Sequence, residues 1–271
     1  MEQKKYSREN PRHAGKPAFR RAQPDPETAE NLLEGRNAVQ EALTAGRPID
    51  KVYIAAGETD RALARLAAMA REAGAAVAET DRRKLDQLSA TGAHQGIIAV
   101  VAAHAYASVD DILENAKRRG EAPLIVICDE LSDPHNLGAI IRTAECAGAH
   151  GVIIPKRRSV GLTAVVGKAS AGALEYLPVA RVSNLVSTIR ELQKAGVWVF
   201  GTAADGDTAL YKANLKGPAA IVIGNEGEGM SRLVSEACDF KVSIPMHGRI
   251  SSLNASNAAA ILLYEAVRQR G

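Results

Sequence analysis

The sequence has few aromatic residues and few cysteines, and it contains no long apolar run. Aromatic side chains make up 4% of its 271 residues, so a core must be built mainly from Ala, Val, Ile and Leu. Its three cysteines, Cys128, Cys146 and Cys238, fit neither a disulfide framework nor a C-x-x-C zinc site. No apolar run approaches the roughly 20 residues of a membrane-spanning helix, and the first residues lack the apolar stretch of a signal peptide. We therefore expect a cytoplasmic protein with no membrane partner.

A strong net charge is also missing, because 34 Lys and Arg residues stand against 31 Asp and Glu residues. The excess of +3 lies in residues 1–28, which carry seven basic and four acidic side chains. This segment is rich in Pro, Lys and Arg and has no hydrophobic period, so we expect a disordered basic arm. Such an arm could contact a nucleic acid or serve only as a solvated tail, and the sequence leaves both possibilities open.

Hydrophobic patterning predicts alternating strands and helices from about Leu32 onward. Predicted strands are 51–55, 97–101, 124–128, 152–154, 197–200, 219–223 and 242–244; predicted helices are 33–43, 61–72, 110–119, 139–147, 185–194 and 255–269. Apolar strands of this kind are typical of a largely parallel sheet covered on both faces. We expect an α/β protein with the basic arm at 1–28, a first domain at 29–104, a linker at 105–122 and a second domain at 123–271.

Two glycine-rich segments resemble nucleotide-binding motifs but depart from them. The segment from Gly161 to Ala169 has five residues between its glycines instead of four, and Ala169 replaces the hydroxyl residue that binds Mg²⁺. Residues 224–229 read G-x-x-G-x-G, which is not the dinucleotide-binding order. The six histidines form no metal-spaced pair, and no G-x-S-x-G motif occurs. Nucleotide hydrolysis, dinucleotide-dependent oxidation and metal or serine hydrolysis are therefore disfavoured, and we expect no metal.

Three other segments place polar residues and glycines directly after a predicted buried strand, where α/β sheets bind ligands. In residues 129–144, Asn136 is predicted to cap a helix, and Arg142 follows within reach of an anion. Residues 223–231 combine three glycines with two glutamates, which favours a cationic or neutral ligand. Helix capping or a tight turn could explain each segment alone. Residues 242–258, however, contain more small polar side chains than a cap needs: Ser251, Ser252, Asn254, Ser256 and Asn257.

The order of these motifs resembles that of the SpoU branch of the SPOUT RNA methyltransferases. The chain reads N-x-G-x-x-x-R-T-A, then I-G-N-E-G-x-G, then I-P-M-x-G-x-x-x-S-L-N-A-S, within residues 124–270. The block from Leu33-Glu-Gly-Arg-Asn37-Ala-Val to His94-Gln95-Gly96-Ile is similar to the ribosomal-protein-like RNA-binding domain of that family.

The resemblance implies an S-adenosyl-L-methionine (AdoMet)-dependent enzyme that methylates a ribose 2′-OH and works as a homodimer. It implies an N-terminal ribosomal-protein-like α/β RNA-binding domain and a C-terminal, mostly parallel α/β SPOUT domain with a trefoil knot. A 2′-OH acceptor means RNA and not DNA. The two-domain build is most similar to the enzymes that modify a guanosine of 23S rRNA. A tRNA guanosine methyltransferase and a non-catalytic RNA-binding protein of the same fold are the alternatives.

The resemblance also implies roles for individual residues. By motif position, the AdoMet contacts are Thr202, Gly224, Asn225, Gly227, Ile244, Met246 and Leu253. The catalytic set is Arg142, its orienting partner Asn136, and Glu226, Ser252 and Asn254, which hold the knot loops and the acceptor ribose. Because an arginine keeps its proton up to a pKa of about 12 or more, we expect Arg142 to bind the phosphate beside the acceptor and to polarise the hydroxyl. Further RNA contacts are expected at Lys156-Arg157-Arg158, at Arg249 and in the basic arm.

Overall fold

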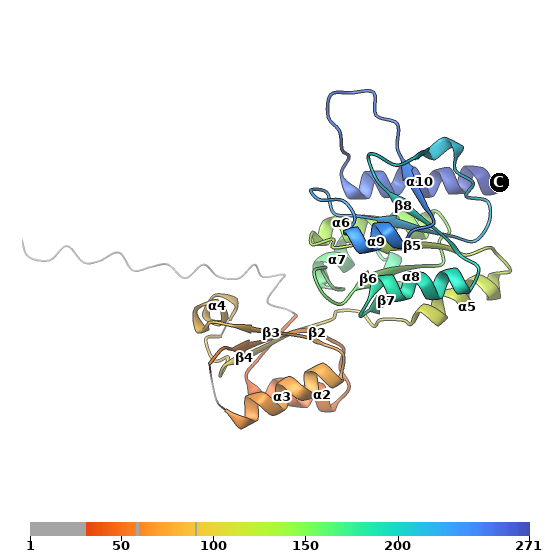
Figure 1. Ribbon diagram of the computed structural model, residues 1–271. Coiled ribbons are helices and arrows are strands. Elements are labelled where there is room, and N and C mark those ends of the chain that lie inside the picture. The colour runs from red at the N-terminus through yellow and green to blue at the C-terminus, as the bar shows by residue number, and fades with distance from the viewer. Residues whose placement is uncertain (1–30, 58–59, 90) are drawn as a thin grey trace, which may run out of the picture.

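The computed structural model describes residues 31–57, 60–89 and 91–271, which form two separate β-sheets with helices on their faces (Figure 1). One sheet belongs to the N-terminal part of the chain and the other to the C-terminal part. The basic arm predicted for residues 1–28 lies outside the described residues. Within the described ranges, no helix is long and apolar enough to cross a membrane.

The N-terminal sheet is mixed and has the strand order β1-β4-β2-β3. Its elements are β1 (Leu32–Glu34), α2 (Arg36–Thr44), β2 (Ile49–Ala55), α3 (Arg61–Glu72), β3 (Ala76–Thr80), α4 (Arg82–Leu88) and β4 (Ile97–Val101). β2 and β3 are parallel, whereas β4 is antiparallel to both β1 and β2. Helices α2 and α3 bury Val39 and Leu66 against Val52 of the sheet, and α4 packs Leu85 against Ile98 on the other face.

The C-terminal sheet is parallel throughout and has the strand order β7-β6-β5-β10-β8-β11-β9. Its strands are β5 (Leu124–Cys128), β6 (Gly151–Pro155), β7 (Val179–Val182), β8 (Trp198–Thr202), β9 (Thr208–Ala209), β10 (Ala219–Ile223) and β11 (Phe240–Ser243). One face is covered by α6 (Pro134–Cys146), α7 (Ala164–Ala169) and α10 (Ala255–Arg270). The other face is covered by α5 (Val109–Arg119), α8 (Leu185–Lys194) and α9 (Arg232–Ala237).

These observations confirm the predicted α/β class with a largely parallel sheet, while several elements differ from the prediction. The helix predicted from Leu33 is wrong at its start, because residues 32–34 form β1 and Gly35, with φ 88°, turns the chain before α2 begins at Arg36. Strand β3 was not predicted, since residues 76–80 are only half buried and carry a weak apolar pattern. The predicted helix 110–119 is confirmed as α5, which begins with a capping box at Ser108 and ends at the left-handed Gly120.

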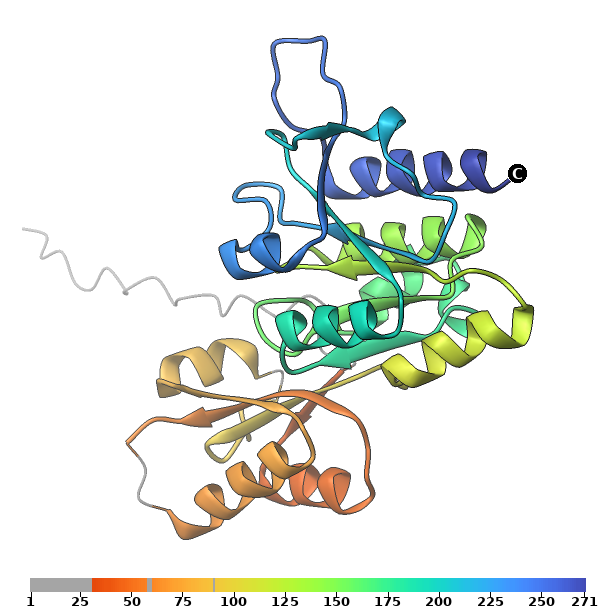
Figure 2. The same cartoon turned by 45° about the vertical axis from the view of Figure 1, so that its right-hand side comes forward.

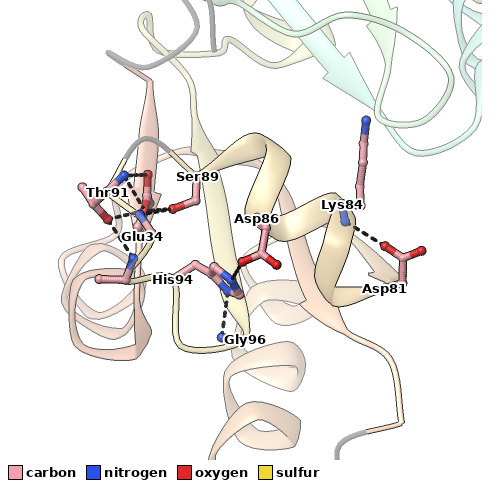
Figure 3. A network of polar contacts seen from close by, with 10 residues as sticks. Glu34, Asp81, Lys84, Asp86, Ser89, Thr91, His94 and Gly96 are labelled. Atoms are coloured by element: carbon pink, nitrogen blue, oxygen red, sulfur yellow. Dashed lines mark hydrogen bonds and ion pairs between the residues drawn. The ribbon is translucent and has the colours of Figure 1, made fainter. Parts of the chain in front are cut away.

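A polar network joins the two N-terminal segments that carry the family resemblance (Figure 3). Glu34 at the end of β1 accepts hydrogen bonds from the hydroxyls of Ser89 and Thr91, each at 2.5 Å. The buried His94 accepts a hydrogen bond at Nδ1 from the backbone N–H of Gly96, at 3.1 Å. With the pairing of β1 and β4, the hydrogen bonds to Glu34 hold the segment before β4 against the end of β1.

The strand order of the C-terminal sheet reverses direction near its centre. The chain adds β6 and β7 on one side of β5, crosses to β8 on the other side, and later inserts β10 between β5 and β8. Ligands of open parallel sheets bind at the carboxyl ends of the strands beside such a reversal. The segments after β8, β10 and β11 meet there, and the segment between β11 and α10 projects from the body at the top of Figure 2.

Candidate active site

A cavity of about 490 Å³ lies at the carboxyl ends of β8, β10 and β11. This volume falls within the range of roughly 300–1,000 Å³ that is typical of small-molecule sites. Most of its wall comes from residues 202–205, 223–230 and 242–258, which follow these three strands. The parallel sheet thus brings together three segments that are far apart in the sequence.

All seven residues predicted to contact a cofactor line this cavity: Thr202, Gly224, Asn225, Gly227, Ile244, Met246 and Leu253. The hydroxyl of Thr202 donates a hydrogen bond to the carbonyl of Val222 at 2.8 Å and so ties the end of β8 to β10. Of the five residues predicted to be catalytic, Glu226 and Ser252 line the cavity, whereas Asn136, Arg142 and Asn254 do not.

The segment after β10 forms a tight loop against the cavity. Asn225 and Gly229 exchange backbone hydrogen bonds of 3.0 and 2.8 Å, and Gly229 has the left-handed φ of 71°. The Asn225 side chain accepts from the N–H of Gly227 at 2.8 Å and donates to the carbonyl of Glu130 at 3.1 Å. Gly224 faces the returning backbone so closely that an added Cβ would lie 2.3 Å from the N atom of Met230. The loop therefore requires glycine at position 224 for its close packing.

The cavity carries negative charge. Asp205, Glu226 and Glu228 are among its lining residues, and none of the described lining residues is Lys or Arg. Three carboxylates repel a phosphate group and attract a cation, which favours a cationic ligand over a nucleotide triphosphate. Among the described residues, no group of three or more His, Cys, Asp or Glu side chains is placed to hold a metal ion.

Asn136 links two segments of the cavity wall from behind. Its side-chain amide donates a hydrogen bond to Glu226 Oε1, and its Oδ1 accepts one from Asn254 Nδ2 at 2.9 Å. Asn254 in turn caps α10, since its Oδ1 accepts from the N–H of Ser256 at 2.9 Å. Asn136 is buried, whereas Glu226 and Asn254 are exposed, so the buried amide of α6 connects the segment after β10 with the start of α10.

The predicted N-cap role of Asn136 is wrong. Helix α6 begins at Pro134, and Asp133 caps it by accepting a hydrogen bond from the N–H of His135 at 2.9 Å. Proline suits the first helical position because its fixed φ is helical and its missing N–H would have no partner there. The helix therefore starts earlier than predicted, and the Asn136 side chain is available for the contact with Glu226.

Arg142 lies on the exposed surface of α6 and does not line the cavity. Among the described residues, no hydrogen bond or ion pair engages its guanidinium. Of the residues predicted to contact RNA, Arg157 and Arg249 are exposed, while Arg158 forms an ion pair of 3.0 Å with Glu130. These guanidinium groups lie on the surface outside the acidic cavity.

Two further carboxylates were not among the predicted site residues. Asp129 is buried and accepts a hydrogen bond from the N–H of Ser231 at 2.7 Å, which anchors the end of the loop after β10. Asp205 lines the cavity after β8. Both residues follow a predicted buried strand. Since ligands of parallel sheets bind at the carboxyl ends of the strands, this position in the sequence could have identified both carboxylates.

Two family models match the chain. Residues 123–264 match the SpoU rRNA methylase family, and residues 32–107 match the model described as RNA 2′-O ribose methyltransferase substrate binding. Among known proteins, YacO of Bacillus subtilis, whose name assigns it to the TrmH family of tRNA/rRNA methyltransferases, is 48% identical over 236 residues, which cover 87% of this chain and 94% of YacO.

Solved structures agree with these matches. The SpoU methyltransferase AviRb from Streptomyces viridochromogenes, in complex with AdoMet, is 31% identical with a TM-score of 0.56, over 88% of this chain and 89% of AviRb. The AdoMet-bound rRNA methyltransferase from Sinorhizobium meliloti is 27% identical with a TM-score of 0.54, over 88% of this chain and 86% of that one. The chain therefore belongs to the SpoU rRNA methylase family, the SpoU/TrmH-type RNA 2′-O-ribose methyltransferases.

Proposed function

We propose that this protein transfers a methyl group from AdoMet to the ribose 2′-OH of a guanosine in 23S rRNA. The observation that carries the proposal is the acidic cavity after β8, β10 and β11, whose walls contain two of the three family motifs. The residues present fit the cofactor. The cavity has room for a small molecule, its carboxylates suit a ligand with a sulfonium and an ammonium group, and Ile244, Met246 and Leu253 offer apolar surface.

AdoMet supplies an activated methyl group when it is bound. The proposed cofactor contacts are the seven lining residues named above, several of which would act through backbone groups. Glu226 and Ser252 border the same space, and Asn136 and Asn254 hold Glu226 and the start of α10 in register. Such positioning of an acceptor can supply roughly 7–11 kcal/mol in favourable models.

Arg142 is proposed to bind the phosphate beside the acceptor ribose and to polarise the 2′-OH, and to act as a base only with the help of that phosphate. An arginine fork matches two phosphate oxygens, which a lysine cannot do. Arg142 is exposed and lies outside its own chain's cavity lining, and this supports the proposed homodimer, in which the arginine of a second copy completes the site. We also propose the trefoil knot of the C-terminal segment, supported by the shared cavity wall of residues 223–230 and 242–258.

Residues 29–104 are proposed to bind the RNA, residues 105–122 to link the domains and residues 123–271 to carry the reaction. The match of residues 32–107 to a substrate-binding model supports this division. The rRNA methyltransferase of Sinorhizobium meliloti matches 88% of the chain, whereas the tRNA-modifying enzyme of A. aeolicus matches 59%, and this difference favours rRNA. The name of YacO includes tRNA, so a tRNA substrate is the second candidate. We also propose a cytoplasmic location, which agrees with either RNA substrate.

Mapping 2′-O-methyl groups in total RNA from cells with and without this protein tests the substrate. One 23S guanosine is expected to lose its methyl group, and a loss confined to tRNA would refute the rRNA assignment. Calorimetry tests the enzyme class separately: one AdoMet is expected to bind per chain, whereas a non-catalytic RNA-binding protein of this fold would bind none.

A further inference from the structure

A buried ion pair joins the N-terminal sheet to the C-terminal sheet. Arg181 of β7 lies with its Nη1 2.7 Å from Asp50 Oδ1 of β2, and the two side chains are 8% and 6% exposed. A second nitrogen of the same guanidinium, Nη2, donates to the backbone carbonyl of Asp50 at 2.7 Å. The arginine therefore holds both the side chain and the main chain of Asp50.

A tyrosine from the segment between the two sheets completes this contact. The Tyr106 hydroxyl donates to Asp50 Oδ1 at 2.6 Å and accepts from the N–H of Leu162 at 2.9 Å. The guanidinium carbon of Arg181 lies 5.3 Å from the centre of the Tyr106 ring. The residue after Tyr106 is also engaged, since Ala107 forms a parallel bridge with Ala180 of β7. The Tyr106 side chain thus contacts residues of both sheets and fixes the segment that connects them.

The backbone of each partner is adapted to this contact. The β2–β4 register shifts at Asp50, between Ile49 and Lys51, as in a β-bulge, a feature that re-aims a side chain. Gly161 makes room on the other side, because an added Cβ would lie 2.0 Å from Asp50 Oδ2. Gly161 is the first glycine of the segment that resembles a phosphate-binding loop. In the structure its missing side chain makes room for the Asp50 carboxylate.

The pair is poorly optimised for stability. Asp50 Oδ2 and Arg181 Nε are buried without a hydrogen-bond partner among the described residues, and burial is the main cause that raises the pKa of Asp50. Buried ion pairs are often no better for stability than apolar residues of the same size, and their best-attested use is to fix one arrangement of the parts they join. The directional hydrogen bonds of the Asp50–Tyr106–Arg181 cluster fit that use.

We propose that Asp50, Tyr106 and Arg181 are positioning residues that fix the RNA-binding domain relative to the cavity and thereby select which nucleotide is methylated. This inference rests on the proposed function. None of the three residues lines the cavity, so they act on the bound RNA through the domain that holds it and not through the cofactor. A misplacement of about 1 Å can reduce a rate on the order of 100-fold, so a modest change of domain angle is enough.

Two variants of the full-length protein test the cluster without deleting a charge. Gly161→Ala pushes against the Asp50 carboxylate, and Tyr106→Phe removes the hydroxyl that joins Asp50 to Leu162. Gly217→Ala is the matched control, because an added Cβ at Gly217 meets nothing within 4 Å. Melting temperature and AdoMet affinity are measured for each, so that a general folding defect is recognised by a loss of cofactor binding.

Domain placement is read from spin-label distances between the exposed Cys146 and Arg65→Cys, in a Cys238→Ser background diluted with unlabelled protein. Both cluster variants are expected to broaden this distance distribution, to lower kcat/KM for RNA roughly ten- to 100-fold and to spread methylation to neighbouring nucleotides, with AdoMet affinity unchanged. The proposal is overturned if the distance distribution is unchanged in both variants. It is also overturned if the distribution broadens but the same single nucleotide is still methylated. The distance measurement does not depend on methyl transfer. A protein without methyltransferase activity would therefore refute the proposed function, while the distance distribution would still test the contact between the domains.

Discussion

Gly224→Ala is the substitution whose effect the structure specifies most closely. The added methyl carbon would lie 2.3 Å from both the carbonyl carbon of Gly229 and the N atom of Met230. Carbon atoms in good contact are about 3.5–4.0 Å apart, so this backbone must move by more than about 1 Å. Such overpacking costs about 1–3 kcal/mol, or roughly 2–12 °C in Tm for a domain of this size. Gly229 and Met230 both line the cavity, so the same movement deforms the cofactor site.

Thermal unfolding and calorimetric titration with AdoMet measure the two consequences. We expect Gly224→Ala to lower Tm within that range and to weaken AdoMet binding at least about tenfold, which is about 1.4 kcal/mol. Gly217→Ala is the control, since its added Cβ meets nothing within 4 Å and Gly217 does not line the cavity, and it should bind AdoMet within about twofold of the parent protein. Native Tm and affinity in Gly224→Ala would refute the packing argument.

Three further predictions concern the site and α10. Asn136→Ala removes two hydrogen bonds whose other partners, Glu226 and Asn254, are exposed, so it should cost about 0.5–1.5 kcal/mol in urea unfolding and slow single-turnover methyl transfer; native values for both would contradict the network. Arg142→Lys should lower kcat at least about tenfold with AdoMet affinity within about twofold, and near-native turnover would argue against phosphate binding by the fork. Hydrogen bonds from Arg268 and Gln269 lower the pKa of the Glu265 carboxylate to about 2. The stabilisation that this ionised carboxylate contributes is therefore present above the unfolded pKa of about 4.3 and is lost as the pH falls from there toward 2. Glu265→Gln should flatten the pH dependence of the free energy of unfolding in that window. An unchanged slope would count against the role of Glu265.

The sequence predicted the fold class and the composition of the cavity wall because both depend on local patterns. Apolar strands and the glycine and polar segments after them are visible in the sequence, and the rule for parallel sheets places their ends at one edge. The segments that contain Gly224 and Leu253 could therefore be assigned to one ligand site although they are far apart in the chain, while the family resemblance named these two residues.

The contacts that depend on packing between elements could not be predicted in this way. The Asn136 side chain was expected to satisfy its own helix, and only the early start of α6 at Pro134 turns it toward Glu226. The bulge at Asp50 and the need for glycine at 161 arise where two sheets meet, and no local pattern marks such a meeting point. The glycine-containing segment that begins at Gly161 could be recognised in the sequence, but its contact with Asp50 could not.

The hydrogen-bonded chain from Glu226 through Asn136 to Asn254 also orders events during synthesis of the protein. Its three members enter the chain at positions 136, 226 and 254, so the link closes only after most of the polypeptide has left the ribosome. Contacts between such distant residues form slowly because a long loop must close first. The cavity is consequently among the last parts of the molecule to be completed, whereas all strands of the N-terminal sheet have been synthesised once the chain reaches Val101.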